Sequence, residues 1–289
     1  MGVLLALLAA VLAAPLGVLS AVPARAGVGP AALSFWRAAL AWPLFAAHAR
    51  ATRSPPLDAA GFRAALALGG LCIAALYVTY QLALREAGVL LGTALAEAAP
   101  IWVVPIARLV LRERLSVKRL AGCGLTVAGL LVFFGDALQR GVGLRALLAG
   151  LLASVTYAAY YVASAAAAAG RPASRVLGVS MFAAALVLAP FARTARASPS
   201  GWACVALVAV VCTYGAYLTK TAALARIGAA RVAALGTLEP VLATLLALAV
   251  LHERVTVALA AGLFVEMAGL ALVAFPEHAP VREPARRRT

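Results

Sequence analysis

Apolar runs of membrane-spanning length, separated by short connectors, constrain the fold of this chain more than any other feature of its sequence. A helix needs about 20 apolar residues to cross about 30 Å of hydrocarbon. We predict roughly ten such stretches, at Gly2–Val22, Ala31–Ala49, Arg63–Leu84, Gly88–Leu111, Val117–Phe134, Leu144–Ala168, Ser174–Phe191, Trp202–Leu224, Ala229–Leu251 and Val257–Phe275. No connector is long enough for a soluble domain, so any function must lie within the helical bundle.

The composition supports an all-α, polytopic membrane bundle. Hydrophobic residues make up 65% of the 289 residues and charged residues 12%, whereas about a quarter of a soluble globular chain is charged. The net charge of +15 does not indicate a nucleic-acid partner, because the basic residues lie mostly between the apolar runs, where they anchor membrane proteins. The four cysteines form no CxxC pair and have no His at metal-ligand spacing, so we predict no metal site and no cofactor.

The distribution of loop charges predicts the orientation. With the amino terminus in the cytoplasm, fifteen Arg and Lys residues lie inside and seven outside. We therefore expect a multi-pass protein of the cell (inner or plasma) membrane with both termini cytoplasmic and a basic cytoplasmic tail at residues 276–289. The first stretch lacks the positively charged start of a signal peptide and its apolar part is unusually long for one, so we expect it to be a retained helix.

An internal repeat organises the chain. Arg112-Glu113-Arg114-Leu115-Ser116 recurs in the second half of the chain as His252-Glu253-Arg254-Val255-Thr256. The same offset in sequence relates Tyr77, Gly88, Pro100, Gly122 and Gly129 to Tyr217, Gly228, Pro240, Gly262 and Gly269. Each copy holds five stretches, an odd number, so the two copies must cross the bilayer in opposite orientations. We predict two inverted five-helix halves, residues 1–138 and 141–275, and such inverted repeats place a substrate site near the midplane of secondary transporters.

Both copies carry a series of recognisable motifs. The second contains Arg226-Ile227-Gly228-Ala229-Ala230-Arg231, Leu238-Glu239-Pro240-Val241-Leu242-Ala243 and His252-Glu253-Arg254-Val255. The first matches more loosely, through Phe35-Trp36-Arg37, Ala99-Pro100 and Leu111-Arg112-Glu113-Arg114-Leu115. The chain therefore resembles two units of the EamA family of the drug/metabolite transporter superfamily. The resemblance implies a ten-helix fold with cytoplasmic termini, a central cavity, and transport of small organic solutes such as amino acids and other metabolites.

Five charged side chains are expected deep within the predicted spans rather than near the bilayer surfaces: Arg37, Glu97, Lys220, Glu239 and Glu266. Each would cost roughly 2.5–3.5 kcal/mol at the bilayer centre, so each needs a partner or a function. Lys220 can pair with Glu97 or Glu239, or contact a carboxylate of the solute, and the sequence leaves these alternatives open. For Arg37, packing against backbone carbonyls or a glutamate is favoured over contact with the solute. Glu266 is expected to pair within the bundle.

The two glutamates near prolines have alternative interpretations. Glu239 precedes Pro240, which lacks a backbone donor and frees a carbonyl one turn earlier. Glu239 is thus either a structural strut, which we favour, or a proton-coupling group. Glu97 corresponds to Thr237 in the other copy, so its charge is not part of the scaffold that the two copies share. A structural role and a functional role are therefore equally good interpretations of Glu97.

Helical periodicity groups uncharged polar residues into stripes on three predicted helices. They are Tyr77, Tyr80, Gln81 and Leu84; Ser154, Tyr157, Tyr161 and Ser164; and Thr213, Tyr217, Lys220 and Leu224. Such stripes avoid lipid, so they face one another or water. We predict that they line a central cavity whose walls include Tyr77, Tyr80, Gln81, Glu97, Tyr157, Tyr161, Tyr217 and Lys220, with Arg37 and Glu239 as coupling or structural charges. The alternative is hydrogen bonding between helices alone.

These features predict a secondary transporter that works by alternating access and moves small organic solutes, such as amino acids or aromatic metabolites, with export as the favoured direction. A membrane-embedded enzyme or a channel using the same cavity is the alternative. No catalytic residue is predicted, because the three histidines lie near helix ends and form no convergent acid–base group. The chain contains no GxxxxGK[ST] loop that would indicate ATP-driven transport. The oligomeric state is left open.

Overall fold

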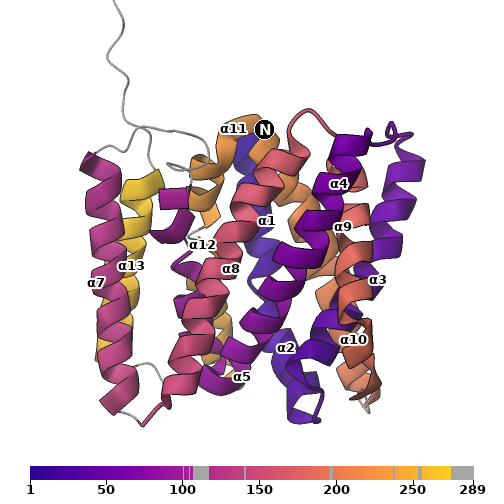
Figure 1. Cartoon of the computed structure of the whole chain (residues 1–289). Helices are drawn as coiled ribbons and strands as arrows, with labels where there is room; N and C mark the ends of the chain where they lie inside the picture. Colours follow the sequence, from indigo (N-terminus) through magenta and orange to yellow (C-terminus); the bar gives the residue numbers. More distant parts are fainter. Residues whose placement is uncertain are drawn as a thin grey trace, which may run out of the picture.

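A computed structural model shows the chain as a bundle of helices (Figure 1). It describes residues 1–99, 101–103, 105–106, 117–139, 141–194, 198–236, 238–252 and 256–274. The predicted motif at residues 112–116, Pro100, Thr237, Glu253 and the tail at 276–289 lie outside the described residues. The elements are α1 Gly2–Ala13, α2 Leu16–Arg25, α3 Pro30–Ala51, α4 Ala59–Ala67, η1 Leu68–Ile73, α5 Ala74–Glu97, α7 Val117–Gln139, α8 Leu144–Ala168, α9 Ala173–Leu188, η2 Ala189–Thr194, α10 Pro199–Leu207, η3 Val208–Gly215, α11 Ala216–Gly236, α12 Leu238–Leu246, η4 Ala247–Leu251 and α13 Val257–Ala274.

The apolar helices fit a polytopic membrane protein. By length and composition five helical stretches of the described residues can cross a membrane, at Gly2–Arg25, Ala59–Val103, Leu144–Ala168, Ala173–Ala192 and Pro199–Ile227. The second of these runs over 45 residues but breaks at Gly88, whose φ of 81° and ψ of 169° are not helical. Glycine adopts such a positive φ without steric cost. The break lies where the sequence places the boundary between the third and fourth predicted spans.

The internal repeat extends to the details of the backbone. Helices α4 and α10 begin at positions related by the offset of the repeat, and each has a side-chain cap. Asp58 accepts a hydrogen bond from the amide of Gly61, and Ser198 accepts one from the amide of Gly201. Such caps satisfy one of the free donors of a helix N-terminus. Each helix then passes into a π-helical segment, η1 or η3, and the starts of these segments are related by the same offset. The offset predicted from sequence therefore relates equivalent structural elements.

Helices α7 and α13 pack against each other through the paired glycines of the repeat, and lie side by side at the left of Figure 1. A Cβ at Gly129 would lie 2.8 Å from the carbonyl oxygen of Gly262, and one at Gly269 would lie 2.6 Å from that of Gly122. Small residues allow this close approach of helix backbones in a membrane. Glu266 is 1% exposed on α13, and neither of its carboxyl oxygens has a hydrogen-bond partner among the described residues, contrary to the expected pairing.

Around η1 and η3 the chain is tightly packed against α9 and α3. A Cβ at Gly69 in η1 would collide with the backbone carbonyl of Ser180 in α9, and the Ser180 hydroxyl donates to the carbonyl oxygen of Ala65 at 2.8 Å. The main buried cluster extends from here to the centre of the bundle and holds most of the tyrosines of both halves. A π-helical turn shifts the side chains that follow it, and such turns are frequent at functional sites.

Candidate functional site

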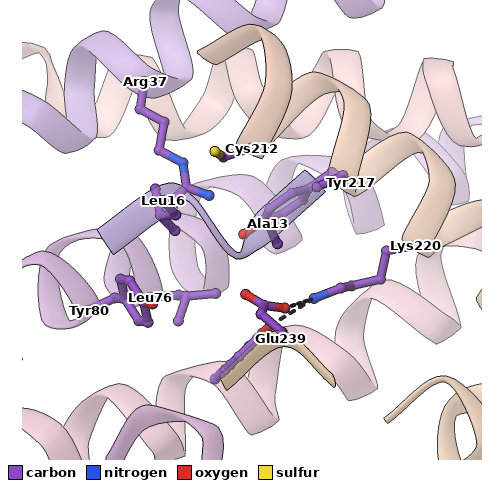
Figure 2. A pocket seen from close by; sticks show the side chains of 11 residues that line it. Ala13, Leu16, Arg37, Leu76, Tyr80, Cys212, Tyr217, Lys220 and Glu239 are labelled. Carbon is purple, nitrogen blue, oxygen red and sulfur yellow. Dashed lines mark hydrogen bonds and ion pairs between the residues drawn. The ribbon is translucent and has the colours of Figure 1, made fainter. Parts of the chain in front are cut away.

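A small cavity lies where the two halves of the chain meet (Figure 2). Its volume is about 20 Å³, enough for about one water molecule. It is lined by Ala13, Leu16, Arg37, Leu76, Tyr80, Tyr157, Cys212, Ala216, Tyr217, Lys220 and Glu239. Six of these residues belong to the set predicted from sequence, and both repeats contribute to it. The cavity in this conformation is too small for an organic solute, so a solute would have to part its walls.

Lys220 forms the buried ion pair of the site. Its ammonium nitrogen lies 3.3 Å from Oε2 of Glu239 (Figure 2). The same nitrogen donates a hydrogen bond of 2.8 Å to the hydroxyl of Tyr157. The side chains of Lys220 and Glu239 are 4% and 6% exposed. The carboxylate stands in the first turn of α12, where the helix dipole stabilises a negative charge. Of the alternatives left open by the sequence, the structure therefore pairs Lys220 with Glu239.

Arg37 has a different environment from the one expected. Its Nε donates to Oγ1 of Thr213 at 2.7 Å, and its guanidinium carbon lies 3.9 Å from the centre of the Tyr77 ring. Stacking of this kind on an aromatic ring stabilises a desolvated cation. Among the described residues no acidic side chain forms an ion pair with Arg37. Its buried charge is thus held by a hydroxyl and an aromatic ring, rather than by the backbone carbonyls or glutamate expected from sequence.

The π-helical segment η3 positions the hydroxyl that holds Arg37. Within η3 the Thr213 hydroxyl donates to the carbonyl oxygen of Val208, five residues earlier, at 2.9 Å. With its proton used in that bond, Oγ1 is free to accept from the guanidinium. Cys212, the preceding residue, lines the cavity. The sequence stripe included Thr213, but it did not show that the residue would lie in a widened helical turn.

An aromatic cluster forms one side of the site. Tyr157 and Tyr161 stack with their ring centres 4.9 Å apart, although Tyr161, a predicted wall residue, does not itself line the cavity. Tyr77 meets Tyr217 edge-on at 6.0 Å. Tyr160 joins the two pairs, because its ring centre lies 5.2 Å from that of Tyr217 and 5.7 Å from that of Tyr161. Tyr160 was not predicted as a site residue from the sequence, although its spacing of three residues from Tyr157 is a signal for the same face of the helix.

Three further predicted residues lie away from the cavity walls. Gln81 donates through Nε2 to the Ser20 hydroxyl at 3.0 Å and lines a second cavity of about 40 Å³. Tyr77 is fully buried beneath the Arg37 guanidinium, and its hydroxyl contacts the sulfur of Met181. Glu97, at the end of α5, is 6% exposed, and its Oε1 has no hydrogen-bond partner among the described residues.

The chemistry of the cavity is that of a binding site with fixed charges. Two cations and one carboxylate are held in place, with hydroxyl groups and aromatic rings between them. In the part of the chain that the structure describes, no three His, Cys, Asp or Glu side chains come close enough together to hold a metal ion. The arrangement can orient a small polar solute by charge, hydrogen bonds and stacking.

Comparison with known proteins identifies the class to which this arrangement belongs. The sequence profile of the EamA-like transporter family matches residues 1–135 and 144–275. The chain therefore belongs to the EamA-like transporter family, with two EamA repeats, and is a polytopic helical membrane protein of the drug/metabolite transporter superfamily.

The comparison with solved structures supports the fold. One crystal structure, described only as that of a protein, shares 22% sequence identity and a TM-score of 0.69 with this chain, over 94% of this chain and 95% of its own. At this identity the likeness shows a shared fold. No curated protein is similar enough to this chain to count as a match.

Proposed function

We propose that this protein is a secondary transporter that carries small organic solutes, such as amino acids or related metabolites, across the cytoplasmic membrane by alternating access. One observation carries the proposal: charged and aromatic side chains from both repeats surround one buried cavity. Arg37 and Tyr80 come from the first repeat, while Tyr157, Lys220 and Glu239 come from the second. Relative movement of two such halves would open the cavity alternately to each side.

The fixed charges support binding of a dipolar solute. Arg37 has no acidic partner among the described residues, so its guanidinium can receive an anionic group such as a carboxylate. The tyrosine rings and Glu239 can receive a cationic or aromatic group. A small cavity fits the proposal as an occluded conformation between two open ones.

The direction and orientation are part of the same proposal. We take export as the direction of transport. We place both termini in the cytoplasm because the loop Arg and Lys residues are in excess on that side. Glu97 and Glu239 are the candidate proton-coupling carboxylates. The two differ in environment, since Glu239 is paired with Lys220, whereas one carboxyl oxygen of Glu97 has no hydrogen-bond partner among the described residues.

Solute counterflow in reconstituted vesicles tests the proposal. Vesicles preloaded with unlabelled amino acids should transiently accumulate a labelled amino acid from outside, because a carrier exchanges solutes through one site. Lys220→Met should abolish the accumulation. Arg145→Gln is the control, because the Arg145 side chain is 77% exposed and its ion pair with Glu86 is long, at 3.7 Å. Passive equilibration without overshoot would favour a channel and contradict alternating access.

A further inference from the structure

A third, much larger hollow lies on the outside of the bundle, away from both the central cavity and the one lined by Gln81. It has a volume of about 300 Å³ and is bounded by α3, α4 and α9, which lie side by side on the right of Figure 1. Its lining is Trp42, Ala46, Ala49, Phe62, Ser174, Arg175, Gly178, Val179 and Phe182. We call this hollow the outer groove. None of its lining residues belongs to the proposed solute site.

The walls of the outer groove are aromatic and only partly covered by the protein. Trp42, Phe62 and Phe182 are 42%, 47% and 45% exposed, and the rings of Trp42 and Phe182 lie 5.4 Å apart. Gly178 and Ala46 add little side-chain volume to the lining, and α9 and α3 approach each other there, since a Cβ at Gly178 would lie 3.8 Å from the amide nitrogen of Ala46. In a membrane-spanning bundle these side chains face hydrocarbon, so the groove suits a flexible acyl chain.

One end of the outer groove is basic. Arg175 lies in the first turn of α9, and Phe182 stands seven residues further along, about 10 Å at the rise of an α-helix. Arg175 donates through Nε and Nη2 to the carbonyl oxygen of Ser54, at 3.1 and 2.9 Å. Among the described residues it forms no ion pair with an acidic side chain. Its position is therefore fixed while its charge is not neutralised.

The segments around this end carry a strong excess of positive charge. Residues 49–63 and 169–175 contain five arginines and a single acidic residue, Asp58. Asp58 is already engaged by Arg171, whose Nε lies 2.9 Å from Oδ1 of Asp58. Basic clusters at the end of a membrane helix attract anionic lipid headgroups.

We propose that the outer groove is a binding site for an anionic phospholipid, with one acyl chain between Trp42 and Phe182 and the phosphate beside Arg175. The charge of the rim favours this occupant over a second copy of the chain. A symmetric contact through this face would bring the two sets of arginines together, at a cost in repulsion. The proposal is independent of which solute the protein carries.

Quenching of Trp42 fluorescence by brominated lipids tests the site directly. The protein is reconstituted in phosphatidylcholine vesicles that contain brominated phosphatidylglycerol or, in parallel, brominated phosphatidylcholine. The signal of a Trp42→Phe variant is subtracted to remove the contribution of the other three tryptophans. Because one arginine near an anionic headgroup favours binding by about fivefold, phosphatidylglycerol should quench Trp42 at about a fivefold lower mole fraction than phosphatidylcholine.

Variants separate the charge from the shape of the groove. The preference is the ratio of the mole fractions of brominated phosphatidylcholine and phosphatidylglycerol that quench Trp42 equally. Arg175→Gln should reduce this ratio to about one, whereas Arg175→Lys, which keeps the charge, should retain it. Arg145→Gln is the control for charge, because Arg145 lies in the first turn of α8, outside the groove. Ala46→Phe should fill the groove and reduce quenching by both lipids, while Ala260→Phe, on an exposed face of α13, should leave it unchanged.

Three results would overturn the proposal. Equal quenching of wild-type Trp42 by the two brominated lipids would mean that the groove holds only bulk lipid. An unchanged preference for phosphatidylglycerol in the Arg175→Gln variant would show that Arg175 does not bind the headgroup. Efficient disulfide cross-linking of an Ala46→Cys variant between two chains, with Trp42 shielded from both lipids, would show that a second copy fills the groove.

Discussion

The buried pair of Lys220 and Glu239 provides a quantitative prediction, because both charges are almost completely removed from solvent. At the observed separation of 3.3 Å, an effective dielectric constant of about 20 gives an attraction of about 5 kcal/mol. Removing one partner leaves the other charge buried without compensation, which costs about 3–5 kcal/mol. Removing both charges eliminates the attraction and the desolvation cost together. The double variant should therefore be far more stable than the sum of the two single losses implies.

The variants are Lys220→Met, Glu239→Met and the double substitution. We expect each single variant to lose about 3–5 kcal/mol in the free energy of unfolding, and the double variant to lose less than either. The measurement is reversible unfolding in mixed detergent micelles, followed by circular dichroism. A double-mutant cycle then gives the interaction energy. Single losses that add within about 0.5 kcal/mol would refute the pairing, because residues that interact do not behave additively.

Three further predictions use matched controls. Tyr157→Phe should lower the free energy of unfolding by about 1.5–3 kcal/mol, because the Tyr157 hydroxyl accepts a hydrogen bond from a charged amine. Tyr160→Phe should have little effect, since the Tyr160 hydroxyl makes no hydrogen bond to a described residue. Equal losses for the two variants in denaturant unfolding would contradict this prediction. Gly69→Ala should lower the melting temperature, because the new Cβ would collide with a backbone carbonyl. Gly124→Ala should keep or raise the melting temperature, because the space around Gly124 is open and alanine favours a helix. A lower melting temperature for Gly124→Ala than for Gly69→Ala would refute the packing. The guanidinium beside Asp58 lowers the pKa of that carboxyl below its usual 3.8, so its stabilising effect is complete above about pH 4 and is lost as the pH falls through the lowered pKa. The melting-temperature difference between wild type and Asp58→Asn should accordingly shrink on acidification, and a difference that stays constant from about pH 6 to pH 3 would argue against this role.

Much of the architecture follows from local sequence. Apolar runs of spanning length determine helices in a bilayer, because the backbone must satisfy its own hydrogen bonds there. The repeat could be read from a constant offset between matching motifs, and the caps at Asp58 and Ser198 obey the same offset. The aromatic face formed by Tyr157 and Tyr161 was predictable from helical spacing alone.

The partners of the buried charges depended on the tertiary structure. Lys220 had Glu97 and Glu239 as alternative partners in sequence, and only the approach of α11 and α12 places it 3.3 Å from Glu239. Arg37 was expected to contact backbone carbonyls or a glutamate. Instead it donates to the hydroxyl of Thr213, which lies in the widened turn of η3, 176 residues further along the chain. The helical period predicts which residues share a face, but which helix packs against that face is determined by side-chain volumes and close glycine contacts across the whole bundle.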